Sequence, residues 1–508
     1  MKTFLDNVDD YLNKFSYTEN GAIAYRSSGN ELVDFNFKIS YYREHQKEIE
    51  KDFDNLLDNY DNNETIARFL FYIGDIREGL GEREIFKVCL KKFLKLLSKE
   101  KALQILSFVS EYNRWDSLWK IVIDDDELFN IALPIINNQL LKDLENLDED
   151  KPVSLLAKWL PSENASSIET KESAKKIRRA LKLSSKMYRL VLTALREQID
   201  VTEVKMSSNK WNEISYEKVP SKANLIYSNA FMKHDSERRT RYIESLQKGE
   251  AKINSSVNYP YEIIDKYTKG AFYYYDAIDT VRTYNELYEQ MWKALPKLNI
   301  KNTLVVRDGS GSMLDKVGNT SCLSVATSLA IYLSENNSKA WKDKFITFSA
   351  HPKIVDLSNY NTLMEKINVA YKEADCSNTN IYKTMKLVLD TAIENNISQH
   401  DMPEMILIIS DMQFDERSFH MNGSLFDNIK LEFEKAGYKL PRICFWNVTG
   451  NHSGTIPMRE NEYGLILCSG FSVNIVKMFL SGKVNPYQIL LDTLYSKRYD
   501  PIGEVFNN

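Results

Sequence analysis

The chain has 508 residues, of which 43% are hydrophobic, and a formal net charge of −5. This length is sufficient for two or more domains with a sizeable core, and the weak negative balance gives no support by itself to nucleic-acid binding. No apolar run approaches the roughly 18 residues needed to cross a bilayer, and the first residues lack a basic-then-apolar signal pattern. We therefore expect a cytoplasmic protein rather than an extracellular one.

The cysteines are odd in number and scattered along the chain. They are Cys89, Cys322, Cys376, Cys444 and Cys468, and no two form a C-x-x-C pair. This pattern predicts reduced thiols and indicates neither a disulfide framework nor a zinc site.

Residues 1–296 are predicted to form a helical repeat domain. From residue 64 onward apolar side chains recur at helical spacing, through residues 66–73, 85–94, 103–109, 118–123 and 131–141. The joints between these segments are short and carry breakers, as at residues 79–81 and 164–166. Successive helices with short joints predict antiparallel helix pairs, as in a HEAT-like α-solenoid, although no clean fixed-period repeat is present.

Positive charge is concentrated in residues 171–250, which contain 18 lysines and arginines against 10 aspartates and glutamates. Two clusters there are candidate RNA-contacting residues, the first a helical stripe and the second a group with Tyr227 and Tyr242 nearby for stacking. The candidates are Lys175, Lys176, Arg178, Arg179, Lys182, Lys186 and Arg189, followed by Lys233, Arg238, Arg239 and Arg241. The alternative is a solvated surface whose cations pair with acidic neighbours.

An α/β pattern occupies residues 297–480. Strands are predicted at 303–307, 344–349, 405–411, 441–447 and 463–468, separated by helical patterns such as 321–335 and 381–394. This alternation predicts a mostly parallel sheet covered on both faces. Residues 481–508 are predicted to be a C-terminal helix, at 486–494, and a tail that packs back on the body.

The end of the first of these strands carries the sequence Asp308-Gly309-Ser310-Gly311-Ser312, a D-x-S-x-S turn. Two more oxygen donors, Thr379 and Asp411, follow at loops of the kind found at strand ends, which meet at one edge of a parallel sheet. Carboxylates and hydroxyls are the ligands of a hard divalent cation, so we predict Mg²⁺, or equally Mn²⁺, in this site. The ligands would be Asp308, Ser310, Ser312, Thr379 and Asp411. The alternative is a decayed site that binds nothing.

These residues resemble the metal-ion-dependent adhesion site of a von Willebrand factor A domain, over roughly positions 298–480. The resemblance implies a Rossmann-like fold and a metal coordination position left open for an acidic residue of a protein partner. Two positions depart from the usual pattern. Arg307 stands where an apolar residue is usual and either pairs with a nearby carboxylate or weakens metal binding, and Asn380 stands where Asp is frequent.

Seven short strings resemble a second family. They are FYIGDIREGLGERE (71–84), YNRWD (112–116), KWLPS (158–162), SSNKW (207–211), VPS (219–221), AFMKHD (230–235) and CFWNV (444–448). Together they resemble domain-of-unknown-function family 2828 along nearly the whole chain. In architecture that family is similar to the Ro autoantigen (TROVE) proteins, which join a ring of helical repeats to a von Willebrand A-like domain and bind small structured RNAs. Fold alone does not fix function.

Enzyme chemistry is not indicated, because no H-E-x-x-H, Walker A or G-x-S-x-G motif occurs. We expect a non-catalytic protein. The first possibility is a ribonucleoprotein subunit that binds RNA through its helical domain and a protein partner through the metal ion. The second is a metal-dependent protein-interaction scaffold that binds no RNA. A viral or phage structural component is a third reading, suggested by the Lys/Asn/Ile-rich composition and the viral members of the family.

Overall fold

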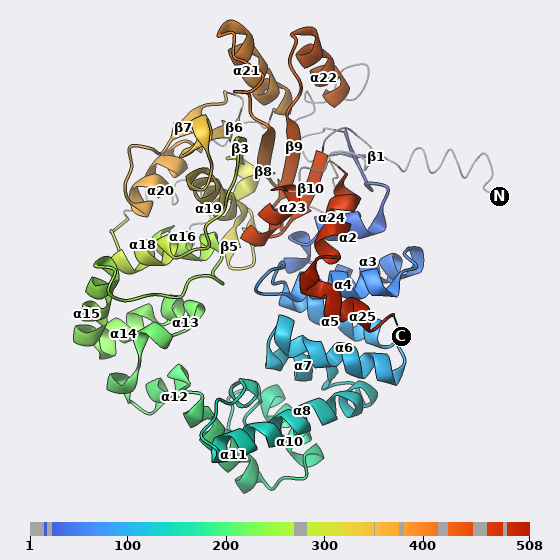
Figure 1. The fold of residues 1–508 in the computed structure, drawn as a ribbon, viewed down its shortest axis with the longest axis vertical. Coiled ribbons are helices and arrows are strands. Elements are labelled where there is room, and N and C mark those ends of the chain that lie inside the picture. The colour runs from blue at the N-terminus through green and yellow to red at the C-terminus, as the bar shows by residue number, and fades with distance from the viewer. Residues whose placement is uncertain are drawn as a thin grey trace, which may run out of the picture. The chain divides into compact units, whose positions relative to one another are not determined.

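The computed structural model describes residues 15–17, 23–268, 282–349, 351–374, 380–414, 425–450, 465–480 and 485–507. The chain forms two compact units (Figure 1). One, the sheet unit, comprises Met1–Asp61 and Ser255–Thr493; the other, the helical unit, comprises Asn62–Asn254 and Leu494–Asn508. The boundary between units therefore differs from the boundary at residue 296 expected from sequence, because the described residues 23–61, 255–268 and 282–295 belong to the unit that contains the sheet.

The sheet unit is built on six strands in the order β10-β9-β8-β3-β6-β7. Their bounds are β3 Thr303–Asp308, β6 Lys344–Phe348, β7 Ile354–Asp356, β8 Met405–Ser410, β9 Arg442–Asn447 and β10 Leu465–Ser469. Only β7, which the sequence pattern did not reveal, runs antiparallel to its neighbour. Every residue of β3 and β8 is buried, which explains their continuous rather than alternating apolar pattern. In chain order the strands lie 3-2-1-4-5-6, the doubly wound arrangement, whose direction reverses between β3 and β8.

Helices cover both faces of this sheet. On one face a cluster joins β-strand side chains such as Val306 and Ile408 to α21 (Ile381–Glu394), α22 (Leu425–Lys435) and the N-terminal α2 (Glu31–Phe37). On the other face α19 (Cys322–Glu335) contacts β3, β6 and β8, and is in turn contacted by α16 (Pro260–Thr268) and α20 (Leu363–Lys372). The predicted combination of a helical part and a covered α/β sheet is confirmed at this level.

Hydrogen bonds hold the added segments onto the sheet. Ser40, which follows α2, donates through Oγ to the main-chain oxygen of Asn447 (2.9 Å) and accepts from the amide of Gly470 (3.0 Å). Asp265 on α16 accepts from Ser324 on α19 (2.5 Å). The sheet unit also contains α3 (Gln46–Asn59), α18 (Glu286–Lys293), α23 (Val476–Leu480) and α24 (Pro486–Leu494), and the short antiparallel pairs β1 (Phe15–Tyr17) with β2 (Ile23–Tyr25) and β4 (Lys316–Val317) with β5 (Thr320–Ser321).

The helical unit is a succession of helices in which neighbours and next neighbours pack together. Their bounds are α4 Asn63–Gly74, α5 Arg83–Leu94, α6 Lys99–Tyr112, α7 Trp115–Val122, α8 Asp126–Asp148, α9 Leu156–Trp159, α10 Ile168–Ala180, α11 Ser185–Gln198, α12 Thr202–Ser207, α13 Ser221–Ile226, α14 Ser228–His234 and α15 Ser236–Gln247. Side-chain caps fix several starts. Asn62, Ser98, Asp125, Ser167 and Ser184 each accept a hydrogen bond from a backbone amide of the first turn.

The chain returns at its end to the first helices of the helical unit. There α25 (Asp500–Glu504) packs against α4, where Arg68 donates to Asp500 (3.2 Å). The backbone at Gly503 lies so close to Arg68 that a Cβ there would meet the guanidinium at 2.0 Å. Among the described residues, no helix is both long and apolar enough to span a membrane.

Candidate functional site

Asp308 and Asp411 lie at the carboxyl ends of β3 and β8, the two adjacent strands between which the sheet reverses direction. Ligands of doubly wound sheets bind in the crevice outside the strand ends at this point, because the loops diverge there. Asp308 is fully buried and Asp411 is 2% exposed. The fold therefore brings together the two carboxylates that the sequence marked as metal ligands.

Hydrogen bonds to both carboxylate oxygens orient Asp308. Its Oδ1 accepts from the amide of Ser310 (2.9 Å), and its Oδ2 accepts from the hydroxyl of Ser410 (2.5 Å). Burial, and then the charge of Asp411, raise the pKa of the Asp308 carboxyl to about 7. Because both carboxylates are buried, their negative charges are poorly screened by water and repel each other. A cation bound between them would offset that repulsion.

Two serine hydroxyls are the other potential metal-ligating groups in the described part of the cluster. The Oγ atoms of Ser310 and Ser312 lie 3.2 Å apart, and Asp411 Oδ1 accepts from the amide of Gln413 (3.2 Å). Burial, and then the Asp411 charge, raise the pKa of the Cys322 thiol, so that this neighbour remains a thiol and is no thiolate ligand. Two carboxylates and two hydroxyls fit a hard cation such as Mg²⁺. Thr379, the fifth predicted ligand, lies outside the described residues, as does Cys376.

Within the described ranges there is no group of three histidine, cysteine, aspartate or glutamate side chains of the kind that holds a metal. The cluster at the strand ends has only two such side chains, and its remaining donors are hydroxyls. It is therefore a different kind of donor set from a histidine- or cysteine-based centre.

The two positions that depart from the von Willebrand A pattern have structural roles. Arg307 extends toward α19 and donates to Thr327 Oγ1 (3.4 Å) and to the main-chain oxygen of Glu373 (3.1 Å). Asn380 caps α21, since its Oδ1 accepts from the amide of Lys383 (2.9 Å).

The predicted RNA-contacting residues fall into three groups. Five form ion pairs: Lys175 with Glu172, Lys176 with Asp126, Arg178 with Glu163, Arg238 with Asp235 and Arg241 with Glu237. Arg239 is fully buried among the rings of Tyr216, Phe231 and Tyr242, and is thereby removed from the candidate surface. The other five are exposed and form no ion pair with any described residue: Arg179, Lys182, Lys186, Arg189 and Lys233.

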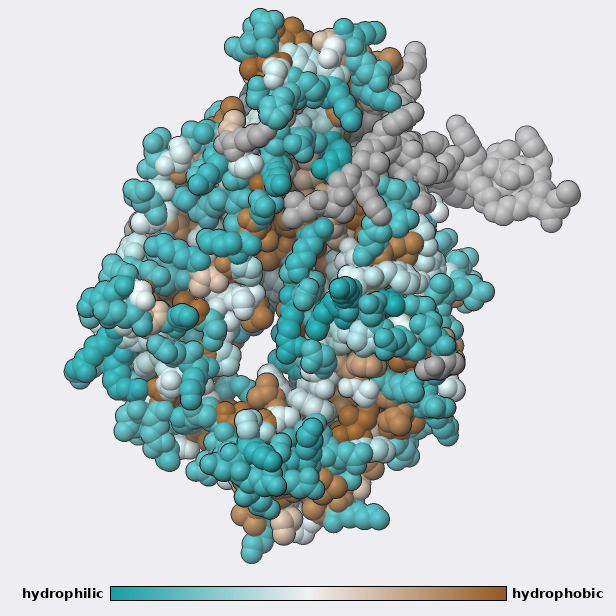
Figure 2. All heavy atoms as spheres, viewed as in Figure 1, coloured by the Kyte–Doolittle hydropathy of each residue, from teal (hydrophilic) through white to brown (hydrophobic). Residues whose placement is uncertain are grey.

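The surface over α10 and α11 is mixed in character (Figure 2). Hydrophilic side chains predominate there, and exposed apolar ones such as Ile168, Met187 and Leu190 lie among them. The basic residues therefore do not form an unbroken charged stripe, in contrast to the helical projection of the sequence.

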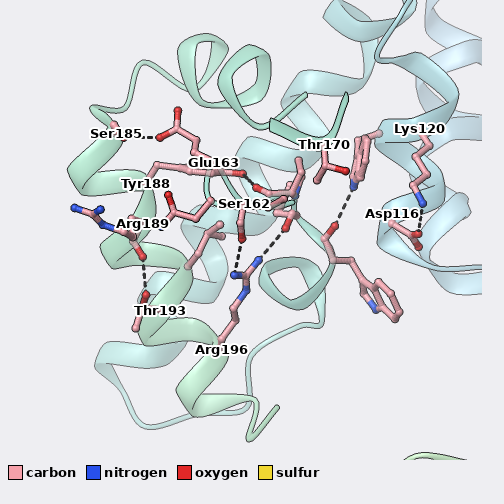
Figure 3. Close-up of a pocket in the computed structure, with 17 residues that line it drawn as sticks. Asp116, Lys120, Ser162, Glu163, Thr170, Ser185, Tyr188, Arg189, Thr193 and Arg196 are labelled. Carbon is pink, nitrogen blue, oxygen red and sulfur yellow. Dashed lines mark hydrogen bonds and ion pairs between the residues drawn. The ribbon is translucent and has the colours of Figure 1, made fainter. Parts of the chain in front are cut away.

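A groove of 730 Å³ lies beside α11, bounded by α7, α9, the segment 160–165 and the first turn of α10 (Figure 3). Arg189 lines it and is also one of the exposed cations just described. The groove was missed by sequence reasoning, because its lining comes from separate segments between residues 116 and 196 and has no local signature. The string KWLPS, which contributes Trp159 and Ser162 to the lining, entered the sequence analysis only as part of the family resemblance.

The segment between α9 and α10 is held in place from α11. Arg196 donates to the main-chain oxygens of Ala157 and Leu160 (both 2.8 Å) and to Ser162 Oγ (2.9 Å). Tyr188 donates to the main-chain oxygen of Pro161 (2.9 Å). These bonds satisfy the main-chain acceptors of a non-helical segment and fix one wall of the groove (Figure 3).

Two family models match the chain. Residues 127–302 match "Domain of unknown function (DUF2828)", which confirms the resemblance to that family indicated by the sequence strings. Residues 302–492 match a separate model, "Domain of unknown function (DUF7788)". The first model covers a shorter part of the chain than the strings did, and the metal-site residues fall in the second.

Individual proteins match over most of the chain. "Uncharacterized protein L728" of Acanthamoeba polyphaga mimivirus is 28% identical over 531 residues, which cover 96% of this chain and 88% of that protein. Among solved structures, the Ro (RSR) protein of Deinococcus radiodurans aligns with a TM-score of 0.44 and 13% identity, over 84% of this chain and 90% of that one.

Proposed function

We propose that this protein is a non-catalytic binding protein that holds a divalent cation at Asp308 and Asp411 and uses it to bind an acidic side chain of a protein partner. The observation that carries the proposal is the pair of buried, mutually repelling carboxylates at the reversal point of the sheet. Ser310 and Ser312 supply hydroxyl oxygens, and Thr379 is the proposed fifth ligand. The cation, Mg²⁺ or Mn²⁺, supplies positive charge at a coordination position open to the partner's carboxylate.

The way Asp308 is held supports binding rather than catalysis. A carboxylate with both oxygens hydrogen-bonded by Ser310 and Ser410 has a fixed orientation, which suits coordination of a cation. A general base, in contrast, needs an oxygen within reach of a substrate proton. We therefore assign no catalytic residue.

Titration of the full chain with Mn²⁺, followed by electron paramagnetic resonance of the free ion, tests the metal site. We expect Asp308→Ala to weaken Mn²⁺ binding by at least about tenfold, because one of two charged ligands is lost. Asp401→Ala is the matched control, since Asp401 is an exposed aspartate in the same unit. Equal Mn²⁺ affinity in the two variants would overturn the proposal.

RNA binding by the helical unit is our second candidate function. It is favoured by the exposed lysines and arginines that form no ion pair with another described residue. Lys182, Lys186 and Arg189 lie along and just before α11, where they could neutralise successive phosphates. Charge reversal of these three should abolish binding of a structured RNA in a filter-binding assay. The control reverses three exposed lysines of the sheet unit, Lys47, Lys51 and Lys372. If the wild-type protein binds no RNA at low salt, RNA binding is excluded and a metal-dependent protein-interaction scaffold is the function that remains.

A further inference from the structure

In the groove beside α11, the acidic side chains of the lining are paired with basic ones, and the rim carries positive charge. Asp116 is paired with Arg114 (2.7 Å) and Lys120 (3.0 Å), and these partners lower the pKa of its carboxyl despite burial. A hydrogen bond from Ser185, and then the pairing with Arg178 (2.7 Å), lower the pKa of the Glu163 carboxyl. Both acidic side chains of the lining are thus neutralised within the protein.

Two lining arginines, Arg189 and Arg196, form no ion pair with a described carboxylate, and Arg196 is occupied by main-chain and hydroxyl oxygens of the groove wall. Arg189 is therefore the lining cation that is free to meet a ligand. It is exposed, and neither of the two lining carboxylates is its ion-pair partner. Lys186 lies three residues before it on α11, on neighbouring turns of one face, and Lys182 lies in the turn that precedes the helix. An anionic ligand is therefore favoured, and one with repeated charges could contact all three cations.

The interior offers hydrogen-bonding groups that the described chain does not use. Asn164 is exposed with its side-chain amide unengaged, and the Thr170 hydroxyl makes no bond to another described residue. Trp159 adds half-buried aromatic surface to the lining, to which the nearly buried Trp119 contributes little. Amide and hydroxyl groups next to aromatic rings suit the edges and faces of unstacked bases.

The groove is also formed in advance of any ligand. Arg196 and Tyr188 hold the segment between α9 and α10, and Trp119 Nε1 donates to the main-chain oxygen of Trp159 (3.0 Å). A volume of 730 Å³ falls in the range of roughly 300–1,000 Å³ typical of ligand sites. Little ordering of the protein is then needed on binding.

We propose that this groove binds unpaired nucleotides of an RNA, with the phosphates along Lys182, Lys186 and Arg189 and a base inserted beside Asn164 and Thr170. The proposal rests on RNA binding by the helical unit and adds a place and a substrate class to it. RNA is favoured over an acidic peptide because its charge repeats with every nucleotide, and because the interior joins unused polar groups to aromatic rings.

Thr193→Trp tests the groove directly. Thr193 is exposed on α11 and lines the groove, so that an indole there fills the space (Figure 3). Leu190→Trp is the control, because Leu190 is equally neutral and exposed on the same helix but does not line the groove. Anisotropy is measured with the full chain and two labelled RNAs, an unstructured strand of about 12 nucleotides and a blunt duplex.

We expect Thr193→Trp to weaken binding of the single strand at least about tenfold, which is a typical worth of one stacked base, and to leave duplex binding unchanged. The Leu190→Trp control should bind both RNAs like the wild type. If Thr193→Trp binds the single strand normally while reversal of Lys182 and Lys186 abolishes binding, the groove proposal is wrong and RNA binding stands. If the wild type binds neither RNA, both fail, and retention of an acidic peptide would identify the other ligand class.

Discussion

Asp308 couples the metal site to stability through its proton. Its pKa is about 7 in the folded chain and 3.8 as a free side chain, so the folded state holds the proton more tightly. In the absence of metal, the stabilisation from this group is complete below pH 3.8 and is lost as the pH rises through about 7. Each unit of pKa difference is worth about 1.4 kcal/mol, so the effect is a few kcal/mol at most.

We therefore expect Asp308→Asn to raise the free energy of unfolding at pH 7 in EDTA, because it removes the repulsion with Asp411. Mg²⁺ should stabilise the wild type, because its folded state binds the ion and its unfolded state does not. Mg²⁺ should have no effect on the stability of the variant. Urea unfolding at several pH values between 4 and 7, with EDTA or Mg²⁺, measures both. A wild type that is insensitive to Mg²⁺ would contradict the assignment of the site.

Arg239 is a buried guanidinium in an aromatic cage. Its Cζ lies 4.7 Å from the ring centre of Tyr216 and 5.1 Å from that of Phe231, and its three nitrogens have no hydrogen-bond partner in the described chain. Burial lowers the pKa of this guanidinium. Contacts with ring faces offset part of the desolvation cost of the charge, and an apolar side chain of the same length would avoid that cost.

We predict that Arg239→Met changes the free energy of unfolding by less than about 1 kcal/mol, whereas Arg239→Ala lowers it by about 2–4 kcal/mol through the cavity left among the rings. Neither variant should alter RNA affinity. Chemical denaturation of both variants decides the point. Equal destabilisation by Met and Ala would mean that the charge itself, rather than the volume, holds the cage together.

A buried ion pair with the end of α4, between Arg498 and Asp75, helps to hold the segment that follows α24. Asp75, fully buried, accepts from Arg498 Nε (2.9 Å) and Nη2 (3.2 Å) and from the Tyr499 hydroxyl (3.3 Å). The hydrogen bond with Asp75 is the main cause that raises the pKa of Arg498. Without its partner the Asp75 charge would stay buried and uncompensated.

Arg498→Ala should therefore lower the free energy of unfolding by about 3–5 kcal/mol. Adding Asp75→Asn should recover part of this loss, because the uncompensated charge is then absent. Lys497→Ala, at an exposed neighbouring position, is the control and should change stability by less than about 0.5 kcal/mol. Thermal unfolding of the four proteins provides the comparison, and a double variant that is no more stable than Arg498→Ala would contradict the prediction.

Elements with a strong local pattern could be predicted from the sequence, and contacts between distant elements could not. The strand Met405–Ser410 and the helix Pro486–Leu494 were recognised because a buried strand is continuously apolar and a surface helix has a 3.6-residue period. The same logic placed Asp308 and Asp411 at one sheet edge. The basic stripe was less well predicted, because the burial of Arg239 and the pairing of Arg178 with Glu163 depend on segments that meet only in the folded chain.

The sheet unit is discontinuous in sequence, because residues 62–254 of the helical unit are inserted between its two parts. Its core includes Val33 and Phe37 from the N-terminal segment, which share a cluster with Ile443 of β9. Glu289 on α18 accepts from the amides of Leu363 and Met364 at the start of α20 (2.9 and 3.2 Å). Residues that precede position 297 in the chain are therefore part of the core of the α/β sheet, and one of them caps a helix that packs beside it.

It follows that residues 297–480 expressed alone should fail to fold stably, since the apolar surfaces that face α2, α16 and α18 would be exposed to water. A chain that ends at residue 493 and has residues 62–254 replaced by a flexible linker of about 30 residues keeps these segments and should unfold cooperatively. Near-UV circular dichroism and binding of a hydrophobic dye distinguish the two, because a loosely packed fragment loses the first signal and gains the second. Cooperative unfolding of 297–480 with the stability of the longer fragment would show instead that the docked segments are dispensable.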